Sequence, residues 1–244
     1  MGQADLRVEV QGTSAFDALL TQCRDLAGGR LDAAVAGMLE KTDEVLSELA
    51  MKTQNRETQK LYLEAKEVAR TQRAAMQKQF HASFLSEFKQ RTRKGMKTGS
   101  GSFADVTSDS LELSLVADDD LEETLKFNEM AAKLRRICED ELNALDQRVG
   151  VLLGDADLQS EDNPLSPHAV CDAYKKTCRK VVESAAVRGV FLKLFDDFVA
   201  DELRSIYKAL NELLVQNAIL PKIRYGVTKK EGGKGPKGAK GKGD

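Results

Sequence analysis

The chain has 244 residues, of which 41% are hydrophobic and 31% charged, with a formal net charge of −2 at pH 7. This is enough apolar residue to bury a substantial core, while 5% aromatic residues and the lack of Trp argue against an all-β sandwich or barrel. No apolar run approaches the roughly 20 residues that span a bilayer, and the first residues lack the features of a secretory signal, so we expect a cytoplasmic protein without membrane insertion.

The N-terminal part predicts two long antiparallel helices. We expect residues 1–14 to be disordered. Over residues 16–49 apolar residues recur close to every 3.6 positions. The Gly28-Gly29 pair punctuates this run, so a short first helix or helical segment is expected before a longer one. A second apolar stripe over 61–88 predicts the antiparallel partner of that helix.

A linker and a helix with an acidic start follow. The Gly- and Ser-rich stretch over 95–110 predicts a mobile linker. The segment "LELSLV" at 111–116 alternates apolar and polar residues and is interpreted as extended chain or a short strand. A long helix is expected next, because acidic residues provide a favourable N-terminal end and a helical apolar period continues to residue 152. Gly154 is expected to stop this helix.

The stretch "NPLSPHAVCDAY" predicts the start of a further helix. Proline is favoured at the first helical position after a capping serine, and Ser166 followed by Pro167 satisfies that rule. His168 and Cys171 are three residues apart and are the best candidates for a Cys-His nucleophile. No Asp or Asn is placed in the sequence to orient the histidine, so we favour the helix start over a catalytic pair.

The final helix is the most apolar part of the chain and is expected to be central. Its stripe runs from Val187 to Leu214, and Pro221 prevents its continuation. We therefore expect an all-α bundle of five to six amphipathic helices over 15–225: two long antiparallel helices, the linker and three further helices. The Lys- and Gly-rich residues 226–244 have almost nothing apolar to bury and are expected to form a disordered tail.

The sequence contains no familiar catalytic or cofactor motif. Gly-rich phosphate loops, the nucleophile elbow and the zincin helix are all missing. The four cysteines form no CxxC pair, and the two histidines stand at no zinc-ligand spacing. The segment after Gly154 begins Asp-x-Asp like a calcium-binding loop, but it lacks the turn glycine and the final glutamate of that loop. We therefore expect no cofactor, no metal and no enzymatic activity.

Two charged regions are candidate binding sites. The first is the acidic helix start, which consists of Asp118, Asp119, Asp120, Glu122 and Glu123. This acidic start either binds a protein partner or pairs with the basic segment "KQRTRKGMK" at 89–97 in the same molecule. The tail is a candidate for nonspecific contact with nucleic acid through Lys229, Lys230, Lys234, Lys237, Lys240 and Lys242. Neither basic region interleaves aromatic residues for base stacking, which favours a solvated tail.

Several segments together resemble one bacterial family. They are "CRDLAGGRLDAAVAGMLEKTDEVLSELA", "LSLVADDDLEETLKFNEMAAKLRRICEDELNALDQRVGVLLG", "DNPLSPHAVCDAY" and "FLKLFDDFVADELRSIYKALNELLVQNAILPKIR". They resemble the N-terminal part of a family of long proteobacterial proteins of unknown function, whose members are often labelled automatically as thymidine phosphorylase. The resemblance implies a helical, cytoplasmic, short or truncated member, and it supplies no catalytic residues. The phosphorylase label is disfavoured because no Gly-rich phosphate loop is present.

Three functional hypotheses remain from the sequence. The first is a noncatalytic helical interaction or regulatory domain that binds a protein partner or itself. The second is a nucleic-acid-associated protein that acts through the basic tail. The third is an enzyme with an unrecognised site near His168 and Cys171. We favour the first, because the helices are long and amphipathic and every catalytic motif fails.

Overall fold

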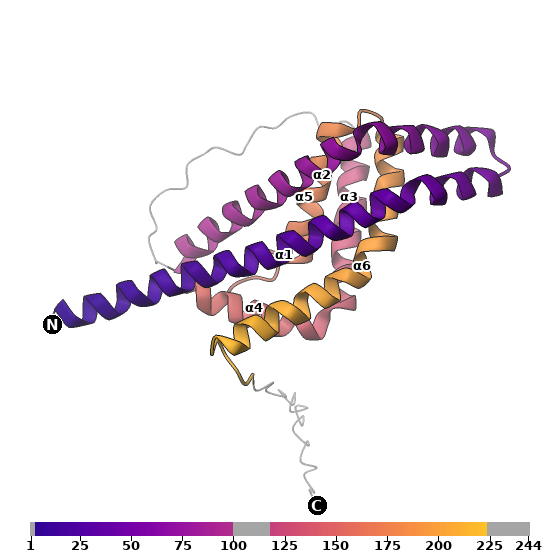
Figure 1. Cartoon of the computed structure of the whole chain (residues 1–244). Coiled ribbons are helices and arrows are strands. Elements are labelled where there is room, and N and C mark those ends of the chain that lie inside the picture. The colour runs from indigo at the N-terminus through magenta and orange to yellow at the C-terminus, as the bar shows by residue number, and fades with distance from the viewer. Residues whose placement is uncertain (1–2, 100–117, 224–244) are drawn as a thin grey trace, which may run out of the picture.

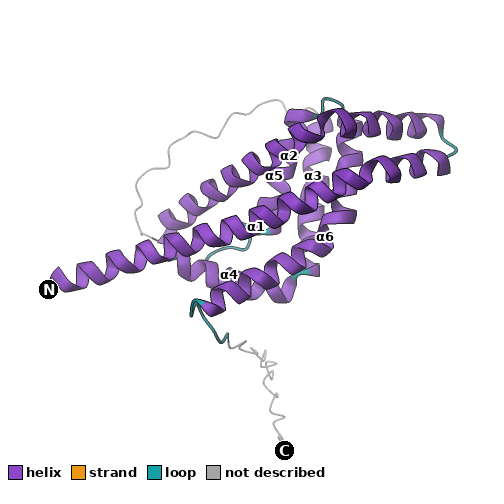
Figure 2. Ribbon diagram, viewed as in Figure 1, coloured by secondary structure: helices purple, strands orange, loops and turns teal. Residues whose placement is uncertain are grey.

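A computed structural model describes residues 3–99 and 118–223, with side chains for 15–96 and 121–223. Within these ranges the chain forms six helices and no strand (Figures 1 and 2). They are α1 (Gln3–Lys52), α2 (Arg56–Gly99), α3 (Asp118–Ile137), α4 (Glu139–Leu153), α5 (Pro167–Val181) and α6 (Ala185–Gln216). The all-α bundle predicted from the sequence is therefore confirmed.

Helices α1 and α2 form a long antiparallel hairpin whose closed end projects beyond the other helices (Figure 1). The turn between them is short, and Asn55 caps α2. Its side-chain oxygen accepts hydrogen bonds from the backbone N–H of Glu57 at 2.9 Å and Thr58 at 3.1 Å. An asparagine at this position satisfies amides that have no partner in the first turn of a helix.

The hairpin is more continuous than the sequence suggested. Helix α1 begins at Gln3, within the stretch 1–14 that was expected to be disordered, and extending an existing helix costs far less than nucleating one. It also passes through Gly28 without a break. A Cβ atom there would lie 3.4 Å from a ring carbon of Phe84, which is an ordinary van der Waals contact with α2. Helix α2 likewise continues to Gly99, into the linker expected over 95–110.

The single long helix expected between residues 118 and 152 is instead two helices, α3 and α4, which makes four helices after the linker rather than three. The interruption falls at Cys138, whose backbone has φ −108° and ψ 24°. The carbonyl of Ile137, just before it, accepts a hydrogen bond from Arg204 of α6. A side chain inserted into the ladder of a helix is a common cause of such a kink.

The centre of the bundle is an aromatic cluster around Tyr174, which is fully buried. The Tyr174 ring stacks on Phe195 with 4.1 Å between ring centroids, and Phe80 meets it edge-on at 6.2 Å. Phe127 of α3 completes the contact at 6.4 Å. The Tyr174 hydroxyl donates to the carbonyl of Phe191 at 3.2 Å, so this polar atom is satisfied inside the core. The cluster joins α2, α3, α5 and α6.

The connection from α4 to α5 confirms the predicted helix boundaries. Gly154 ends α4 in the left-handed region with φ 70°, as glycine does at many helix ends. Ser166 caps α5 by accepting from the N–H of Ala169 at 3.2 Å, with Pro167 as the first helical residue. The stretch "NPLSPHAVCDAY" therefore contains the start of a helix, as the sequence predicted.

Some expectations fall outside the described residues. They concern the extended segment at 111–116 and the tail at 226–244 with its lysines.

Candidate functional site

The predicted acidic site lies at the start of α3, but its residues have different roles. The side chains of residues 118–120 lie outside the described part of the chain. Glu122 is exposed and pairs with Lys126 at 2.7 Å one turn further along α3. Glu123 is buried, and its carboxylate meets Arg188 of α6 at 2.9 Å and Arg179 of α5 at 3.4 Å. Glu123 thus joins three helices, while Glu122 remains accessible.

The candidate pair His168 and Cys171 lies in the first turns of α5. Cys171 is buried, and burial raises the pKa of its thiol, so the sulfur stays protonated near neutral pH. Burial also lowers the pKa of His168, whose Nδ1 has no hydrogen-bond partner among the described residues. A thiolate nucleophile needs the opposite shift at the cysteine, so this environment favours packing over nucleophilic chemistry.

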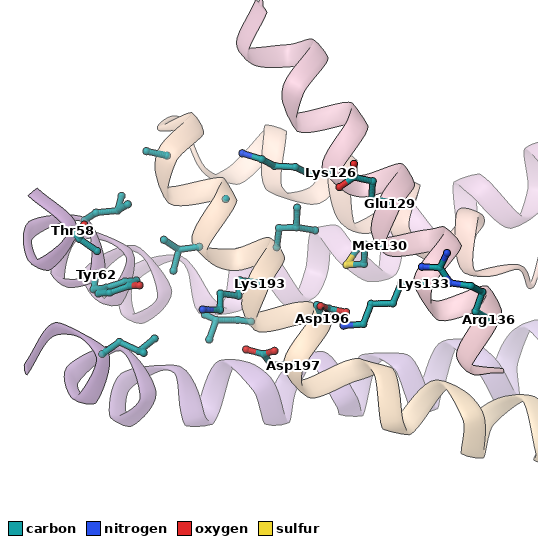
Figure 3. A pocket seen from close by; sticks show the side chains of 17 residues that line it. Thr58, Tyr62, Lys126, Glu129, Met130, Lys133, Arg136, Lys193, Asp196 and Asp197 are labelled. Carbon is teal, nitrogen blue, oxygen red and sulfur yellow. Dashed lines mark hydrogen bonds and ion pairs between the residues drawn. The ribbon is translucent and has the colours of Figure 1, made fainter. Parts of the chain in front are cut away.

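A groove with a volume of about 720 Å³ lies between the hairpin tip, α3 and α6 (Figure 3). Its floor and inner walls are mainly apolar; they include Leu49, Leu61, Tyr62, Met130, Val190 and Leu194. Charged side chains surround this apolar centre; they are Lys126, Glu129, Lys133, Arg136, Lys193, Asp196 and Asp197. We refer to this feature as the α3–α6 groove. An apolar centre with a charged rim is the usual anatomy of a protein interface.

One ion pair crosses the groove and fixes its two long walls. Lys133 of α3 and Asp196 of α6 meet at 2.7 Å, and Figure 3 shows them facing each other. The second carboxylate oxygen of Asp196, Oδ1, is buried and has no hydrogen-bond partner among the described residues.

The α3–α6 groove continues towards the acidic start of α3. A second hollow of about 270 Å³ is lined by Glu122 and Glu123 and shares Lys126, Gly189 and Leu192 with the larger one. On α3 the lining therefore extends from residue 122 to residue 136, which is about 21 Å at 1.5 Å per residue. One end carries an exposed glutamate and the other an exposed arginine.

Gly189 lies at the place where the two hollows meet. It is exposed and interior to α6, and a Cβ built on it would meet nothing within 4 Å. Glycine inside a helix costs about 1 kcal/mol relative to alanine, and no contact within the described chain requires it here. It leaves room for another backbone to approach α6 closely.

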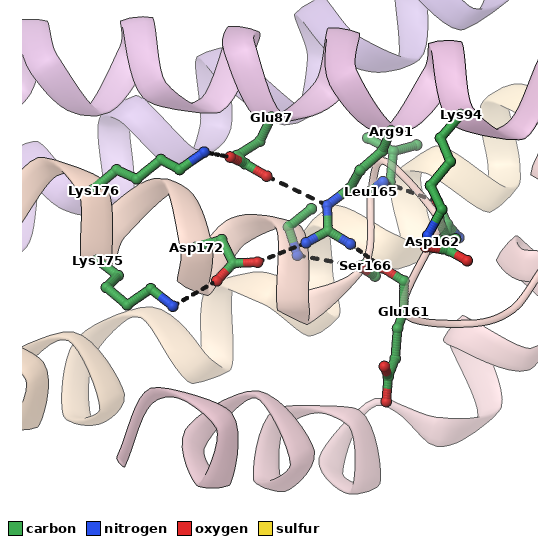
Figure 4. A network of polar contacts seen from close by, with 12 residues as sticks. Glu87, Arg91, Lys94, Glu161, Asp162, Leu165, Ser166, Asp172, Lys175 and Lys176 are labelled. Carbon is green, nitrogen blue, oxygen red and sulfur yellow. Dashed lines mark hydrogen bonds and ion pairs between the residues drawn. The ribbon is translucent and has the colours of Figure 1, made fainter. Parts of the chain in front are cut away.

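A second polar site ties α2 to α5 and to the loop before it (Figure 4). Glu87 is buried and pairs with Lys176 and, at 3.5 Å, with Arg91. Arg91 also pairs with Asp172 at 2.6 Å and donates to the carbonyl of Glu161. Within the basic end of α2, Arg91 is therefore paired with α5, and Lys94 pairs with Asp162 of the loop before it.

The described residues contain neither a cluster of metal-ligating side chains nor a membrane-spanning helix. No group of histidine, cysteine and carboxylate side chains there is arranged to hold a metal ion. None of the described helices is long and apolar enough to cross a membrane.

Comparison with protein families gives one match. The family model described as "Protein of unknown function (DUF1631) N-terminal domain" matches residues 15–218, most of the chain. The chain belongs to this family. No curated protein and no solved structure matches it significantly. The resemblance found in the sequence is thereby confirmed, and the matched range of the DUF1631 domain contains all of the α3–α6 groove.

The sequence did not point to this groove. Its residues come from three segments, near residues 49–62, 126–136 and 186–197, and each looks like an ordinary amphipathic helix. One usable signal was the mixture of charge on α3 and α6 beside an apolar stripe. Glu122 and Glu123 were found as candidates, but adjacent residues on a helix point in different directions, and only Glu122 remained accessible.

Proposed function

We propose that this DUF1631 domain is a noncatalytic protein-interaction module that binds an amphipathic helix of a partner protein in the α3–α6 groove. The observation that carries the proposal is the apolar floor of this groove, open between two helices and the hairpin tip. Helix-in-groove binding uses such a floor, with apolar anchors spaced three or four residues apart. A guest helix would occupy the position of a missing member of the bundle.

The charges at the two ends suggest the direction of the guest. Arg136 lies at one end of the groove and Glu122 at the other. Helices favour acidic residues in the first turn and basic residues in the last. A guest with that common pattern fits with its N-terminus beside Arg136, antiparallel to α3. About 14 residues cover the 21 Å of the groove.

The test uses a designed peptide of about 14 residues, with leucines at helical spacing, an acidic first turn and a basic last turn. Fluorescence anisotropy compares its affinity for the full chain with that of a peptide whose charged ends are exchanged. We expect the first peptide to bind at least about ten-fold more tightly, a difference of about 1.4 kcal/mol. Equal binding of both peptides, or none of either, would count against the proposal.

Two variants assign the peptide to the groove. Gly189→Phe fills the groove floor and should weaken binding at least about ten-fold. Gly29→Phe is the matched control, because Gly29 is also an exposed helical glycine with nothing within 4 Å of its Cβ, and it does not line the groove. Sedimentation is measured beside binding. A wild-type dimer that becomes monomeric on Gly189→Phe would show that the groove takes a second copy of this chain instead.

A further inference from the structure

The charges of this chain are segregated between helices. Residues 70–99 of α2 and 167–181 of α5 together contain twelve lysines and arginines and two acids, a net charge of +10. Because the whole chain has a net charge of −2, the remainder has a net charge of −12. The two basic segments pack side by side, joined by the pairs of Glu87 with Lys176 and of Arg91 with Asp172. They form one surface, which we refer to as the α2–α5 face.

Internal pairing uses only part of this positive charge. Arg91, Lys175 and Lys176 are held by Glu87 and Asp172, as Figure 4 shows. Four other cations on the face have no hydrogen bond or ion pair with any described residue; they are Lys78, Lys89, Arg93 and Lys180. Their charge is available to a partner, whereas the paired cations hold the two helices together.

Three of the unpaired cations share one exposed side of α2. Lys78 and Lys89 are eleven residues apart on α2, close to three full turns, and Arg93 is one turn further. The row is about 22 Å long at 1.5 Å per residue. Lys180 is exposed on α5, the helix that the Glu87–Lys176 and Arg91–Asp172 pairs join to α2. A row of exposed cations on a helix clamped to its neighbour matches an extended anion.

The aromatic and large hydrophobic residues of the α2–α5 face indicate which kind of anion it fits. All aromatic residues of α2 after residue 70 and of α5 are buried; they are Phe80, Phe84, Phe88 and Tyr174. No Phe or Tyr ring is therefore exposed there to stack on the bases of a single strand, and the exposed His81 ring is held by Asp32 of α1 at 2.6 Å. Met96 is the only large hydrophobic residue described as exposed on this face, so there is little to insert into a lipid surface. A double-stranded nucleic acid needs neither, because its phosphates stand on the outside.

We propose that the α2–α5 face binds the phosphate backbone of double-stranded nucleic acid without reading its sequence. Lys78, Lys89, Arg93 and Lys180 supply about four phosphate contacts. This binding is separate from the helix docking proposed above and uses no residue of the α3–α6 groove. It also needs no contribution from the lysines of residues 226–244.

The experiment measures binding of the full chain to a fluorescent DNA duplex and to an RNA duplex, both of about 20 base pairs, across a salt series. Four phosphate contacts predict a slope of about −3.6 for log K against log salt with DNA, or about a hundred-fold loss of affinity from 50 to 200 mM salt. The variant K89E/R93E should reduce the magnitude of the slope by about 2. The control K60E/K208E makes the same charge change at two exposed lysines away from the face and should keep the wild-type slope.

Several outcomes would overturn the proposal. If K89E/R93E and K60E/K208E weaken binding equally, only the net charge matters and the face is not a site. If the slope of K89E/R93E is unchanged, the contacts lie elsewhere in the chain. Binding to vesicles of anionic phospholipid, with none to either duplex, would assign the face to a membrane surface. Tighter binding to DNA or to RNA would decide between these two sources of the same backbone chemistry.

Discussion

Replacing Gly189 with alanine should stabilise the protein, although the residue lies in the proposed binding groove. Gly189 is interior to α6, where glycine is about 1 kcal/mol less favourable than alanine. The new Cβ atom meets nothing within 4 Å, so no steric cost offsets this gain. For a chain of this size, 1 kcal/mol corresponds to a rise in Tm of about 2 to 4 °C.

A second glycine provides the contrast. Gly150 in α4 is buried, and a Cβ atom there would lie 2.6 Å from the backbone carbonyl oxygen of Asp155. A backbone atom cannot rotate away as a side chain can, so Gly150→Ala should destabilise the protein by about 1 to 3 kcal/mol. Urea unfolding followed by circular dichroism measures both free energies of unfolding on the full chain.

The two substitutions together test the geometry of the groove. If Gly189→Ala lowers the free energy of unfolding as Gly150→Ala does, the space above α6 is filled by the chain itself and no groove is open there. A gain in stability would leave the glycine without a role inside the described chain. A glycine at position 189 that lowers stability would then agree with a partner backbone that approaches α6 closely at this position.

Three further predictions concern the α2–α5 connection, and each is read from the free energy of unfolding. Ser166→Ala removes the cap of α5 and should cost about 1 kcal/mol. Glu87→Ala leaves the guanidinium of Arg91 in a largely buried site with one carboxylate fewer and should cost about 2 to 3 kcal/mol. Glu67→Ala breaks only an exposed pair and should leave the free energy of unfolding almost unchanged. Burial lowers the pKa of His168 below 6.5, so the unfolded chain binds its proton first. Stability should therefore fall as the pH drops below about 6.5, and His168→Gln should make that fall shallower.

Local rules in the sequence were enough for the helices and for several of their ends. Ser166, Pro167 and Gly154 act within a few residues of their own position, and the structure places them as expected. The kink at Cys138 could not be found in this way, because its partner Arg204 is on another helix. The continuity of α1 through Gly28 and Gly29 was also hidden, since a glycine pair in the sequence indicates a break.

The candidate sites were harder to predict, because accessibility is a tertiary property. Arg91 and Arg93 are two residues apart in one basic run, yet Arg91 is held in an ionic network and Arg93 has no such contact with the described residues. On α3, Glu122 faces the groove entrance and Glu123 is buried against two arginines. Charge in the sequence locates a charged segment, but the packing of neighbouring helices decides which side chain can meet a partner.

The groove and the basic face should act independently, because they are far apart on α2. Tyr62 lines the groove and Lys89 lies in the basic row, 27 residues further along the same helix, which is about 40 Å. This is several times the Debye length of about 8 Å at physiological salt, so reversing charge at Lys89 and Arg93 should leave the field in the groove almost unchanged. K89E/R93E should then bind the designed peptide like the wild type, and Gly189→Phe should keep the salt slope for duplex. Loss of both activities in either variant, at unchanged stability, would show that one surface serves both ligands and that two separate sites are the wrong description.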